Sequence, residues 1–368
     1  MKPNSMRIVI SGGGTGGHIF PAIAIADTIR NRYPDADILF VGAKGRMEMD
    51  RVPKAGYRIE GLWISGFQRR FSLSNFVFPF KVMNSLLKAR KILKKFNPDV
   101  VVGVGGYASG PTLRAAVQLQ IPVLIQEQNS FPGVTNRLLG KKAACICVAY
   151  DQMEKWFPAE KTVLTGNPLR VSAVAIEGKR DAAFDFFGCN PSIPTIVIVG
   201  GSQGALGINK ALSAQLEKLA QANVQMLWQT GTNYLETAKA EIEKLGCSDK
   251  IKAVAFIDRM DFAYAMANLV VSRAGAMAIS ELAVVAKPVI FVPLPTAAED
   301  HQTKNALRLV EAQAARLVTN SDAPNELVPE MLRLIENELE KAEMAQNIAV
   351  FARRDAAEQI VNQLEKLV

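Results

Sequence analysis

The sequence predicts an α/β fold with two nucleotide-binding domains, each built on a parallel sheet, that face each other across a cleft. The first observation is a pair of glycine-rich turns of similar design, IVISGGGTGGH at residues 8–18 and IVIVGGSQGA at residues 196–205. The second is that short β-branched stretches alternate with helix-length segments in both halves, which indicates parallel βαβ units. The third is the length, because 368 residues are long for one domain and suit two.

In the first half we expect strands at residues 7–11, 38–41, 100–104, 123–126, 145–148 and 163–165. Helical patterns separate them, for example at residues 22–30 and 86–96. Gly166, Asn167 and Pro168 are interpreted as a hinge, because a residue before proline avoids the helical region of backbone space. A polar stretch that contains proline follows as far as Pro194.

The strand pattern starts again after this hinge, at residues 195–199, 224–228, 251–255, 269–272, 289–292 and 316–318. From Glu338 to the end the sequence forms one helical pattern, which we expect to cross back to the first domain. We therefore predict an N-terminal domain over residues 1–166, joined by a C-terminal helix at about residues 345–368. The C-terminal domain is predicted over residues 167–344.

The composition is that of a globular protein, with 49% hydrophobic and 21% charged residues. The four cysteines have no metal-like spacing and the chain has two histidines, so we expect no metal site and reduced cysteines in a cytoplasmic protein. No signal peptide is visible, and no stretch approaches the roughly 20 apolar residues that span a bilayer.

The net charge of +8 is unevenly distributed, because residues 1–165 carry +12 and the rest of the chain carries −4. Residues 61–98 hold eight basic residues and no acid, and Phe67, Phe71, Phe76, Phe78 and Phe80 lie among them. A basic segment of this kind can contact an anionic membrane or nucleic acid, or it can be a solvated helix face whose phenylalanines lie in the core. The density of aromatic residues favours a membrane surface, and their lack of a stacking-motif order argues against nucleic acid.

The first glycine turn, GGGTGGH from Gly12 to His18, is neither the dinucleotide pattern GxGxxG nor a P-loop with its lysine. Five glycines in six positions exceed what a strand–helix turn needs, and they favour close approach of the backbone to a phosphate at a helix N-terminus. His18 follows at the helix start, where it has either a structural role or accepts a proton from a hydroxyl nucleophile. The positive end of the helix dipole weakens it as a base.

Two further polar motifs follow predicted strands of the first half. GVGGYASGP at residues 103–111 is a third glycine turn, and Glu127, Gln128 and Asn129 follow the next strand. Ligands of open α/β sheets bind at the carboxyl ends of the strands, so these residues are expected to line the cleft. The alternative for Glu127 is a solvated loop acid.

In the second half, SRAGAMAISE at residues 272–281 runs from a strand into a helix, and its first backbone amides would face an anion. Glu281 lies one helical turn further on, where a carboxylate can accept both hydroxyls of a ribose. The alternative is a helix-surface acid placed there by the dipole. DHQTKNA at residues 300–306 offers amide and imidazole groups to sugar hydroxyls.

These motifs together resemble one family. GGGTGGHIFPA, EMDRVPKAGY, GVGGYASGP, QEQNSFPGVTNR, GNPLR, GGSQGA, FIDRM, SRAGAMAISE and DHQTKNA occur in this order between Arg7 and about Asn305. In this combination the chain resembles the MurG family of peptidoglycan N-acetylglucosaminyltransferases, in glycosyltransferase family 28. The resemblance implies a GT-B fold of two Rossmann-like domains, with the donor mainly in the second and the lipid acceptor in the first.

The activity implied by the resemblance is inverting transfer of N-acetylglucosamine from UDP-N-acetylglucosamine to the C4 hydroxyl of the muramyl sugar of lipid I. The product is lipid II, and neither a metal nor another cofactor is implied. The resemblance also implies a peripheral protein on the cytoplasmic face of the bacterial inner membrane, which contacts anionic lipid through residues 67–80 and their basic neighbours. It further implies roles in cell shape and division and admits other cell-wall synthesis proteins as partners.

Carried over position by position, the resemblance implies that the backbone of Ile257 meets uridine, that Glu281 holds the ribose and that Ser202 contacts the diphosphate. The implied catalytic residues are His18 and Glu127. The implied substrate-binding residues are Thr15, Gly16, Gly17, Asn129, Arg170, Ser202, Ile257, Ala276, Met277, Ala278, Ile279, Ser280, Glu281 and Gln302, and those on the acceptor side are Gly14, Tyr107 and Asn305. The chain departs from the pattern at Ala278, where relatives have a hydroxyl residue, and a lost phosphate hydrogen bond would weaken donor binding by about 1 kcal/mol.

Three alternatives remain open from the sequence. Within enzymes, these are another lipid-directed GT-B transferase and a UDP-N-acetylglucosamine epimerase of similar shape. An epimerase would not need the basic aromatic segment. From a different class, the chain could be a non-catalytic, nucleotide-binding membrane adaptor, which would leave Glu127, Asn129, Glu281 and Gln302 unexplained.

Overall fold

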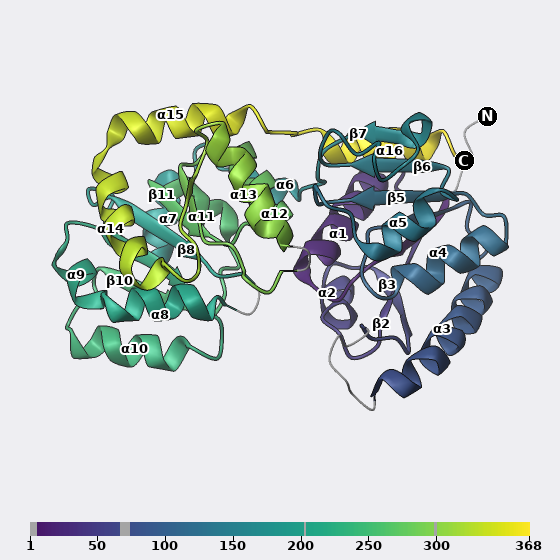
Figure 1. The fold of residues 1–368 in the computed structure, drawn as a ribbon, viewed down its shortest axis with the longest axis horizontal. Coiled ribbons are helices and arrows are strands. Elements are labelled where there is room, and N and C mark those ends of the chain that lie inside the picture. Colours follow the sequence, from purple (N-terminus) through teal and green to yellow (C-terminus); the bar gives the residue numbers. More distant parts are fainter. Residues whose placement is uncertain (1–5, 67–73, 202–203, 298–299) are drawn as a thin grey trace. The chain divides into compact units, whose positions relative to one another are not determined.

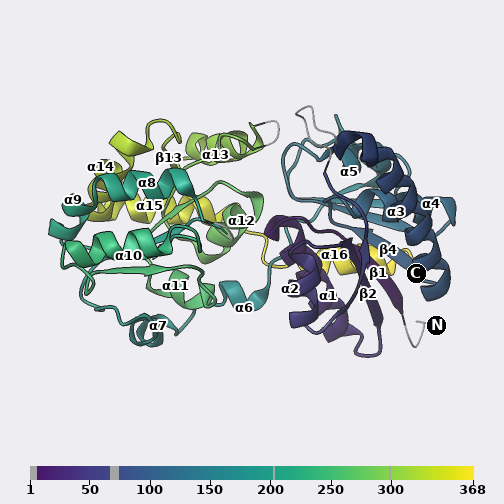
Figure 2. The same cartoon turned by 90° about the horizontal axis from the view of Figure 1, so that it is seen from below.

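The computed structural model describes residues 6–66, 74–201, 204–297 and 300–368. It divides into two compact units, one formed by Met1–Arg170 with Arg353–Val368 (unit 1) and the other by Val171–Ala352 (unit 2). Each unit is a parallel sheet between layers of helices (Figures 1 and 2). Ser202, Phe67 and Phe71 lie outside the described residues, and so does the side chain of Phe76.

Unit 1 contains a sheet of seven parallel strands in the order β3-β2-β1-β4-β5-β6-β7. The central strands are buried on both sides, which is why their sequences are nearly continuous apolar runs. The strands are β1 (Arg7–Ser11), β2 (Asp37–Ala43), β3 (Arg58–Leu62), β4 (Val100–Gly103), β5 (Val123–Glu127), β6 (Cys145–Val148) and β7 (Thr162–Leu164).

Helices cover both faces of this sheet. One core cluster joins the strands to α1, α2 and α16, and the other joins them to α3, α4 and α5. Figure 2 shows α1 and α2 on one side of the strands and α3 and α4 on the other. The bounds are α1 (Gly16–Arg32), α2 (Glu48–Lys54), α3 (Ser74–Phe96), α4 (Ser109–Gln118), α5 (Val134–Gly140), the 3₁₀ helix η1 (Ala159–Lys161) and α16 (Ala356–Glu365).

Unit 2 contains a sheet of six parallel strands in the order β10-β9-β8-β11-β12-β13. The strands are β8 (Thr195–Val199), β9 (Gln225–Gln229), β10 (Ile251–Val254), β11 (Leu269–Ser272), β12 (Val289–Phe291) and β13 (Arg316–Leu317). The helices are α6 (Val171–Val174), α7 (Arg180–Phe187), α8 (Leu206–Ala214), α9 (Leu216–Gln221), α10 (Leu235–Lys244), α11 (Met260–Met266), α12 (Ala276–Val285), α13 (His301–Glu311), α14 (Ala323–Glu336) and α15 (Glu338–Ala349).

Both sheets have the strand order of a Rossmann-like, doubly wound fold, and this prediction is confirmed. The order reverses between β1 and β4 in unit 1 and between β8 and β11 in unit 2. Chains leave these two neighbouring strands toward opposite faces of the sheet, so a crevice forms at their carboxyl ends. The glycine turns of residues 12–17 and 200–204 follow β1 and β8, which brings each turn to its sheet's reversal point.

Every predicted strand is present, with ends that differ by at most two residues, but the sequence missed β3. This strand lies at the sheet edge and exposes Arg58 and Glu60, so it lacks an apolar run. The prediction of one continuous helical pattern from Glu338 is wrong, because the chain leaves the helix between α15 and α16. The break arises because Ile348 of α15 packs in unit 2 whereas Ile360 of α16 packs in unit 1.

The terminal helix α16 is an integral part of unit 1 (Figure 1). Its Leu364 is fully buried in the same core cluster as β1 and α1. At the end of α1, Arg32 donates to Glu365 at 2.7 Å and also pairs with Glu358, while the Tyr33 hydroxyl donates to Glu365 at 2.6 Å. Apolar burial and this polar cluster together attach the chain's last helix to the first domain.

Replacing Leu364 by Ala is expected to lower the free energy of unfolding of unit 1 by about 3 kcal/mol, because it leaves a cavity under α16. The measurement is urea denaturation followed by circular dichroism. The matched control is Leu339→Ala on α15, whose side chain is 86% exposed and which should change the free energy by less than about 0.5 kcal/mol. Equal unfolding midpoints for the two variants would contradict the integration of α16 into unit 1.

Candidate active site

The first glycine turn of unit 1 is in backbone contact with the third one. Gly13 and Gly14 have φ values of +151° and +88°, a conformation that favours glycine. A Cβ atom placed on Gly106 would lie 2.1 Å from the carbonyl oxygen of Gly13, so only glycine fits there. The turns that follow β1 and β4 therefore form one continuous backbone surface at the carboxyl ends of these two central strands.

His18 is the third residue of α1 and is half-buried beside this surface. Its Nδ1 lies 3.4 Å from the hydroxyl of Thr15. Its Nε2 faces Gly105, where an added Cβ would approach the ring nitrogen to 2.9 Å. The two glycine turns and Thr15 thus hold the imidazole ring at the helix N-terminus.

Two more predicted residues lie near the start of α1. Tyr107 is 48% exposed, and its ring edge would be 3.5 Å from a Cβ on Gly14. Arg170 is exposed, and its guanidinium lies 4.6 Å from the ring centre of Phe20 on α1. The structure therefore brings Gly14, Thr15, Gly16, Gly17, His18, Tyr107 and Arg170 to one region of unit 1.

Glu127 ends β5, and its carboxylate is buried within the loop that follows. Oε1 accepts hydrogen bonds from the backbone amide of Asn129 at 3.0 Å and from its side-chain amide at 3.2 Å. Oε2 accepts from the Gly133 amide at 3.1 Å and from Nδ2 of Asn136 at 2.9 Å. Burial raises the pKa of Glu127, while these hydrogen bonds act in the opposite direction.

These four hydrogen bonds indicate that Glu127 orders the loop between β5 and α5 and fixes the side chain of Asn129. Sequence reasoning did not single out Asn136, although it lies in the QEQNSFPGVTNR motif. The sequence shows that an amide side chain is present at this position. It does not show that the turn into α5 brings Asn136, nine positions after Glu127, back to the carboxylate.

In unit 2, the second glycine turn also approaches a neighbouring strand closely. Gly204 has a φ of +77°, and an added Cβ would lie 2.1 Å from the carbonyl oxygen of Thr230, just after β9. Gln229 Nε2 donates to the carbonyl oxygen of Gly201 at 2.7 Å. The predicted residue Ser202 lies outside the described residues of this turn.

The helix α12 begins at the carboxyl end of β11, with Gly275 as its N-cap. Ala276, Met277 and Ala278 are its first three residues, so their amides have no carbonyl partner within the helix. Ile279 is buried, and the Ser280 hydroxyl donates to the carbonyl oxygen of Ala276 at 2.9 Å. The amide groups, rather than the side chains, are the anion-binding groups that this helix offers.

Arg273 lies just before this N-terminus and was not singled out from the sequence. Its guanidinium donates to the carbonyl oxygens of Val292 and Pro293 and to Oδ1 of Asn320, at 2.9 to 3.0 Å. Burial lowers the pKa of this guanidinium, and within the described part of the chain no carboxylate pairs with it. A half-buried cation that is bound by these neutral oxygens leaves positive potential at the carboxyl ends of β11 and β12.

Glu281 is half-buried on α12, and its Oε2 accepts a hydrogen bond of 2.9 Å from the hydroxyl of Tyr264. Tyr264 lies on α11, which follows the β10 loop that contains Ile257. Burial raises the pKa of Tyr264, so its hydroxyl remains a donor that orients the carboxylate. Helix α11 therefore links the two predicted residues: Ile257 lies in the loop that leads into it, and Glu281 of α12 accepts a hydrogen bond from it.

Gln302 is the second residue of α13, which follows β12. Its Oε1 accepts a hydrogen bond of 2.9 Å from the Leu294 amide, which fixes the orientation of the side chain and directs the amide nitrogen away from that loop. Asn305, expected on the acceptor side, lies one turn later on the same helix of unit 2 and is buried. Glu281 is thus oriented by the Tyr264 hydroxyl on α11, and Gln302 by the backbone of the loop after β12.

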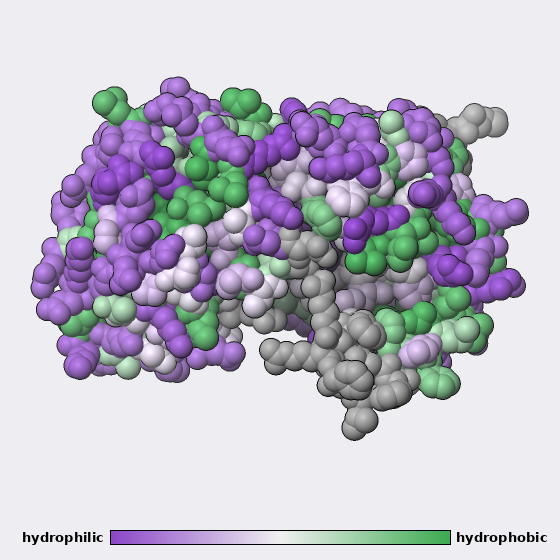
Figure 3. Space-filling view, in the orientation of Figure 1, coloured by the Kyte–Doolittle hydropathy of each residue, from purple (hydrophilic) through white to green (hydrophobic). Residues whose placement is uncertain are grey.

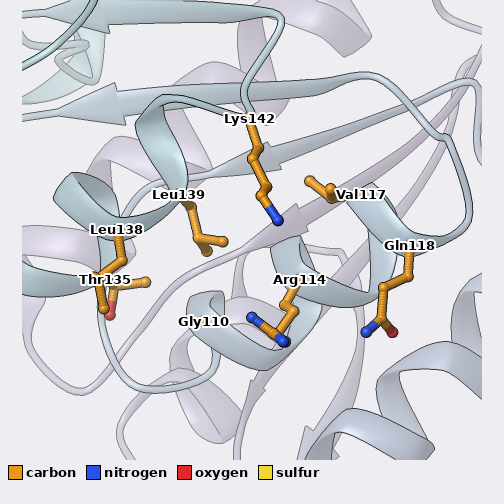
Figure 4. A pocket seen from close by; sticks show the side chains of 8 residues that line it. All are labelled: Gly110, Arg114, Val117, Gln118, Thr135, Leu138, Leu139 and Lys142. Carbon is orange, nitrogen blue, oxygen red and sulfur yellow. The ribbon is translucent and has the colours of Figure 1, made fainter.

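An apolar hollow of unit 1 lies elsewhere. It has a volume of about 360 Å³ between α4 and α5, and Arg114 and Lys142 extend toward it beside Leu138 and Leu139 (Figure 4). None of the predicted catalytic or donor-binding residues lines it. Among the described residues no group of three or more His, Cys, Asp or Glu side chains is arranged to hold a metal ion.

Comparisons with known proteins agree with this architecture. Residues 8–148 match the glycosyltransferase family 28 N-terminal domain, and residues 195–360 match the glycosyltransferase family 28 C-terminal domain. A relative in Cytophaga hutchinsonii is 53% identical over 98% of this chain and 97% of its own length. One in Parabacteroides distasonis is 50% identical over 98% of both chains. Both are named UDP-N-acetylglucosamine–N-acetylmuramyl-(pentapeptide) pyrophosphoryl-undecaprenol N-acetylglucosamine transferase.

Solved structures are similar over the whole chain. The crystal structure of Acinetobacter baumannii MurG has a TM-score of 0.77 at 29% identity and covers 98% of this chain and 99% of its own. The UDP-GlcNAc 2-epimerase of Neisseria meningitidis, bound to UDP-GlcNAc, has a TM-score of 0.66 at 17% identity, with 98% and 100% covered. At that identity the second similarity is one of fold alone.

Replacing Glu127 by Gln is expected to speed hydrogen exchange at the Asn129 and Gly133 amides about tenfold or more, because an amide nitrogen cannot accept the bonds that one oxygen now accepts. Exchange followed by mass spectrometry over residues 123–140 measures this. The matched control is Glu160→Gln, which changes an exposed carboxylate of the same unit. Exchange in the Glu127 variant as slow as in the control would contradict the loop-ordering role.

Proposed function

The chain belongs to glycosyltransferase family 28, and from this premise we propose that it transfers N-acetylglucosamine from UDP-N-acetylglucosamine to lipid I, undecaprenyl-pyrophosphoryl-N-acetylmuramyl-pentapeptide. The product is lipid II, an intermediate of peptidoglycan synthesis. The observation that carries this proposal is the identity of about half of all residues, over nearly full length, with relatives named for this transfer. A non-catalytic adaptor does not account for two matching transferase domains.

We assign the donor to unit 2. The diphosphate of UDP would accept hydrogen bonds from the first amides of α12 and from the second glycine turn, and Arg273 adds positive charge to the same end of β11. Glu281, oriented by Tyr264, would accept the ribose hydroxyls. The backbone of Ile257 would meet uracil, and the amide nitrogen of Gln302 would face the sugar, with Asn305 behind it. Negative charge that develops on leaving UDP would be stabilised by these donors.

We assign the acceptor to unit 1, where the amides of Thr15, Gly16 and Gly17 begin α1. In the reaction, the C4 hydroxyl oxygen attacks the anomeric carbon as the bond from that carbon to UDP breaks. The hydroxyl proton passes to a base, and attack from the face opposite UDP gives the β-linkage. His18 is the better candidate for the base, because both oxygens of Glu127 already accept two hydrogen bonds each. Glu127 would then position Asn129.

We propose that unit 1 also contacts the membrane, on the face formed by α3, α4 and α5. Exposed apolar side chains lie along α3 and α5 on this face, and Figure 3 shows apolar surface over these helices. They are Val77, Phe80, Met83, Leu87, Val134 and Leu138. Basic residues flank them on α3, and Arg114 and Lys142 lie at the hollow between α4 and α5.

Apolar side chains rimmed by cations suit the interface of an anionic bilayer, because they enter the acyl boundary while the cations meet lipid phosphates. No helix of the described residues is long and apolar enough to cross a membrane. We therefore propose peripheral attachment to the cytoplasmic face of the inner membrane, with roles in cell shape and division and with other cell-wall synthesis proteins as further partners.

Incubation with labelled UDP-N-acetylglucosamine and a lipid I analogue is expected to give a lipid-linked disaccharide, and product formation should continue in EDTA. His18→Ala should lower kcat by about 100-fold, the scale of a lost general base, while UDP binding to unit 2 stays at the wild-type affinity. Release of free N-acetylmannosamine would instead assign an epimerase. Formation of neither product would contradict the proposed function. Full activity of His18→Ala would contradict the assignment of His18 as the base.

The double variant Phe80→Ser and Leu87→Ser is expected to bind phosphatidylglycerol vesicles about tenfold or more weakly, because two apolar side chains no longer enter the bilayer interface. Co-sedimentation with vesicles measures the binding, and raised salt should weaken it in the wild type. The control Leu339→Ser changes an apolar residue on α15 of unit 2 that is exposed to 86%, more than either Phe80 or Leu87. Equal vesicle affinities of the two variants would rule out the α3 face.

A further inference from the structure

Glu48 is a buried carboxylate that none of the proposed steps uses. It is the first residue of α2 and is only 1% exposed. Buried carboxylates normally have a cationic partner, but within the described ranges no lysine or arginine pairs with this one. Its hydrogen-bond partners are backbone amides.

The carboxylate of Glu48 joins the end of β2 to the first glycine turn. Oε1 accepts from the Ala43 amide at 2.9 Å, and Oε2 accepts from the Gly14 amide at 2.9 Å. Ala43 is the last residue of β2, and Gly14 is in the turn after β1, 34 positions away from Glu48. One side chain thus fixes the turn to the neighbouring strand through two charge-assisted hydrogen bonds.

The chain leaves room for this carboxylate at two glycines. An added Cβ on Gly13 would lie 2.2 Å from Oε1 of Glu48, and one on Gly42 would lie 2.6 Å from its Cγ. Gly45, three residues before Glu48, has open space around it. Gly13 and Gly42 are therefore matched to the side chain of Glu48, whereas Gly45 is not.

The position of the turn determines what the candidate catalytic histidine packs against. Gly13 is in backbone contact with Gly106, and the adjacent Gly105 lies against the ring of His18. Tyr107 lies against Gly14. A shift of residues 13 and 14 would therefore displace the surface that holds His18 and Tyr107.

Glu48 also determines which amides of the turn are available to an anion. The Gly14 amide is already bound, so the amides open to a phosphate begin at Thr15. The carboxylate charge repels a second anion from the side of Gly13 and Gly14. An anionic ligand is consequently directed to the start of α1, next to His18.

We propose that Glu48 is a positioning residue for the acceptor: it fixes the first glycine turn so that the acceptor diphosphate binds at residues 15–17 beside His18. This inference rests on the proposed transferase function. Glu48 touches neither substrate and acts through the turn.

The test compares Glu48→Gln and Glu48→Asp with Asp50→Asn, in the full chain with UDP-N-acetylglucosamine and a lipid I analogue. Gln keeps the size of the side chain but presents an N–H group to one of the two amide donors, and Asp keeps the charge but is one methylene shorter. Asp50 is the matched control, because it lies on the same helix, is exposed and pairs with Lys54 at the surface.

We expect kcat/KM for the acceptor to fall about tenfold or more in Glu48→Gln, the effect of one lost hydrogen bond to a charged group. Glu48→Asp, which keeps the negative charge, should lower kcat/KM for the acceptor by a smaller factor. In both variants the KM for UDP-N-acetylglucosamine should stay within about twofold of wild type, because unit 2 is unchanged. The far-UV circular dichroism of both variants at the assay temperature should equal that of Asp50→Asn, which unfolding of unit 1 would not allow.

Acceptor kcat/KM values equal to those of Asp50→Asn would overturn the proposal. A loss of circular dichroism signal that parallels the loss of activity in both Glu48 variants would assign this residue to folding alone and would also overturn the proposal. Failure of the wild-type chain to make a lipid-linked product would instead refute the proposed function, so the two failures are distinguishable.

Discussion

The close contact between two backbone turns, at Gly13 after β1 and at Gly106 after β4, is the constraint on which the candidate site of unit 1 depends. The strand order places β1 beside β4, although some ninety residues separate them in the chain. At this spacing a single Cβ on Gly106 would overlap the Gly13 carbonyl. The absence of side chains there lets the turns form one surface, against which the His18 ring is held.

The glycine turn of unit 2 makes its close backbone contact on the other side of its strand. It approaches the end of β9 at Thr230, away from the reversal point at β11, whereas the first turn contacts the turn after β4 across the reversal point of unit 1. The buried carboxylates Glu48 and Glu127 bind the loops that follow β1 and β5 in unit 1, whereas the half-buried Arg273 lies just before α12 in unit 2. Two units with the same strand order therefore place different charged groups at the carboxyl ends of their strands.

The excess of positive charge in the first half belongs to another part of unit 1. Many of its basic residues lie along α3 and near the α4–α5 hollow, on the sheet face that does not carry α1. The loops of the candidate site are held instead by the carboxylates of Glu48 and Glu127, which accept hydrogen bonds from backbone and side-chain amides. Unit 1 thus separates a basic, apolar surface from the turn that is proposed to bind the acceptor.

The sequence by itself determined the two parallel sheets, because β-branched runs, helix-length spacers and glycine turns are local patterns. It also determined the order of the site motifs, since loops at the carboxyl ends of parallel strands share one edge. Only the tertiary structure decided the role of individual side chains. The partners of Glu48 and of Arg273, the four donors to Glu127 and the Tyr264 hydroxyl on Glu281 lie on other segments. The break between α15 and α16 has the same origin, because packing in two different units, and not helix periodicity, ends the first helix.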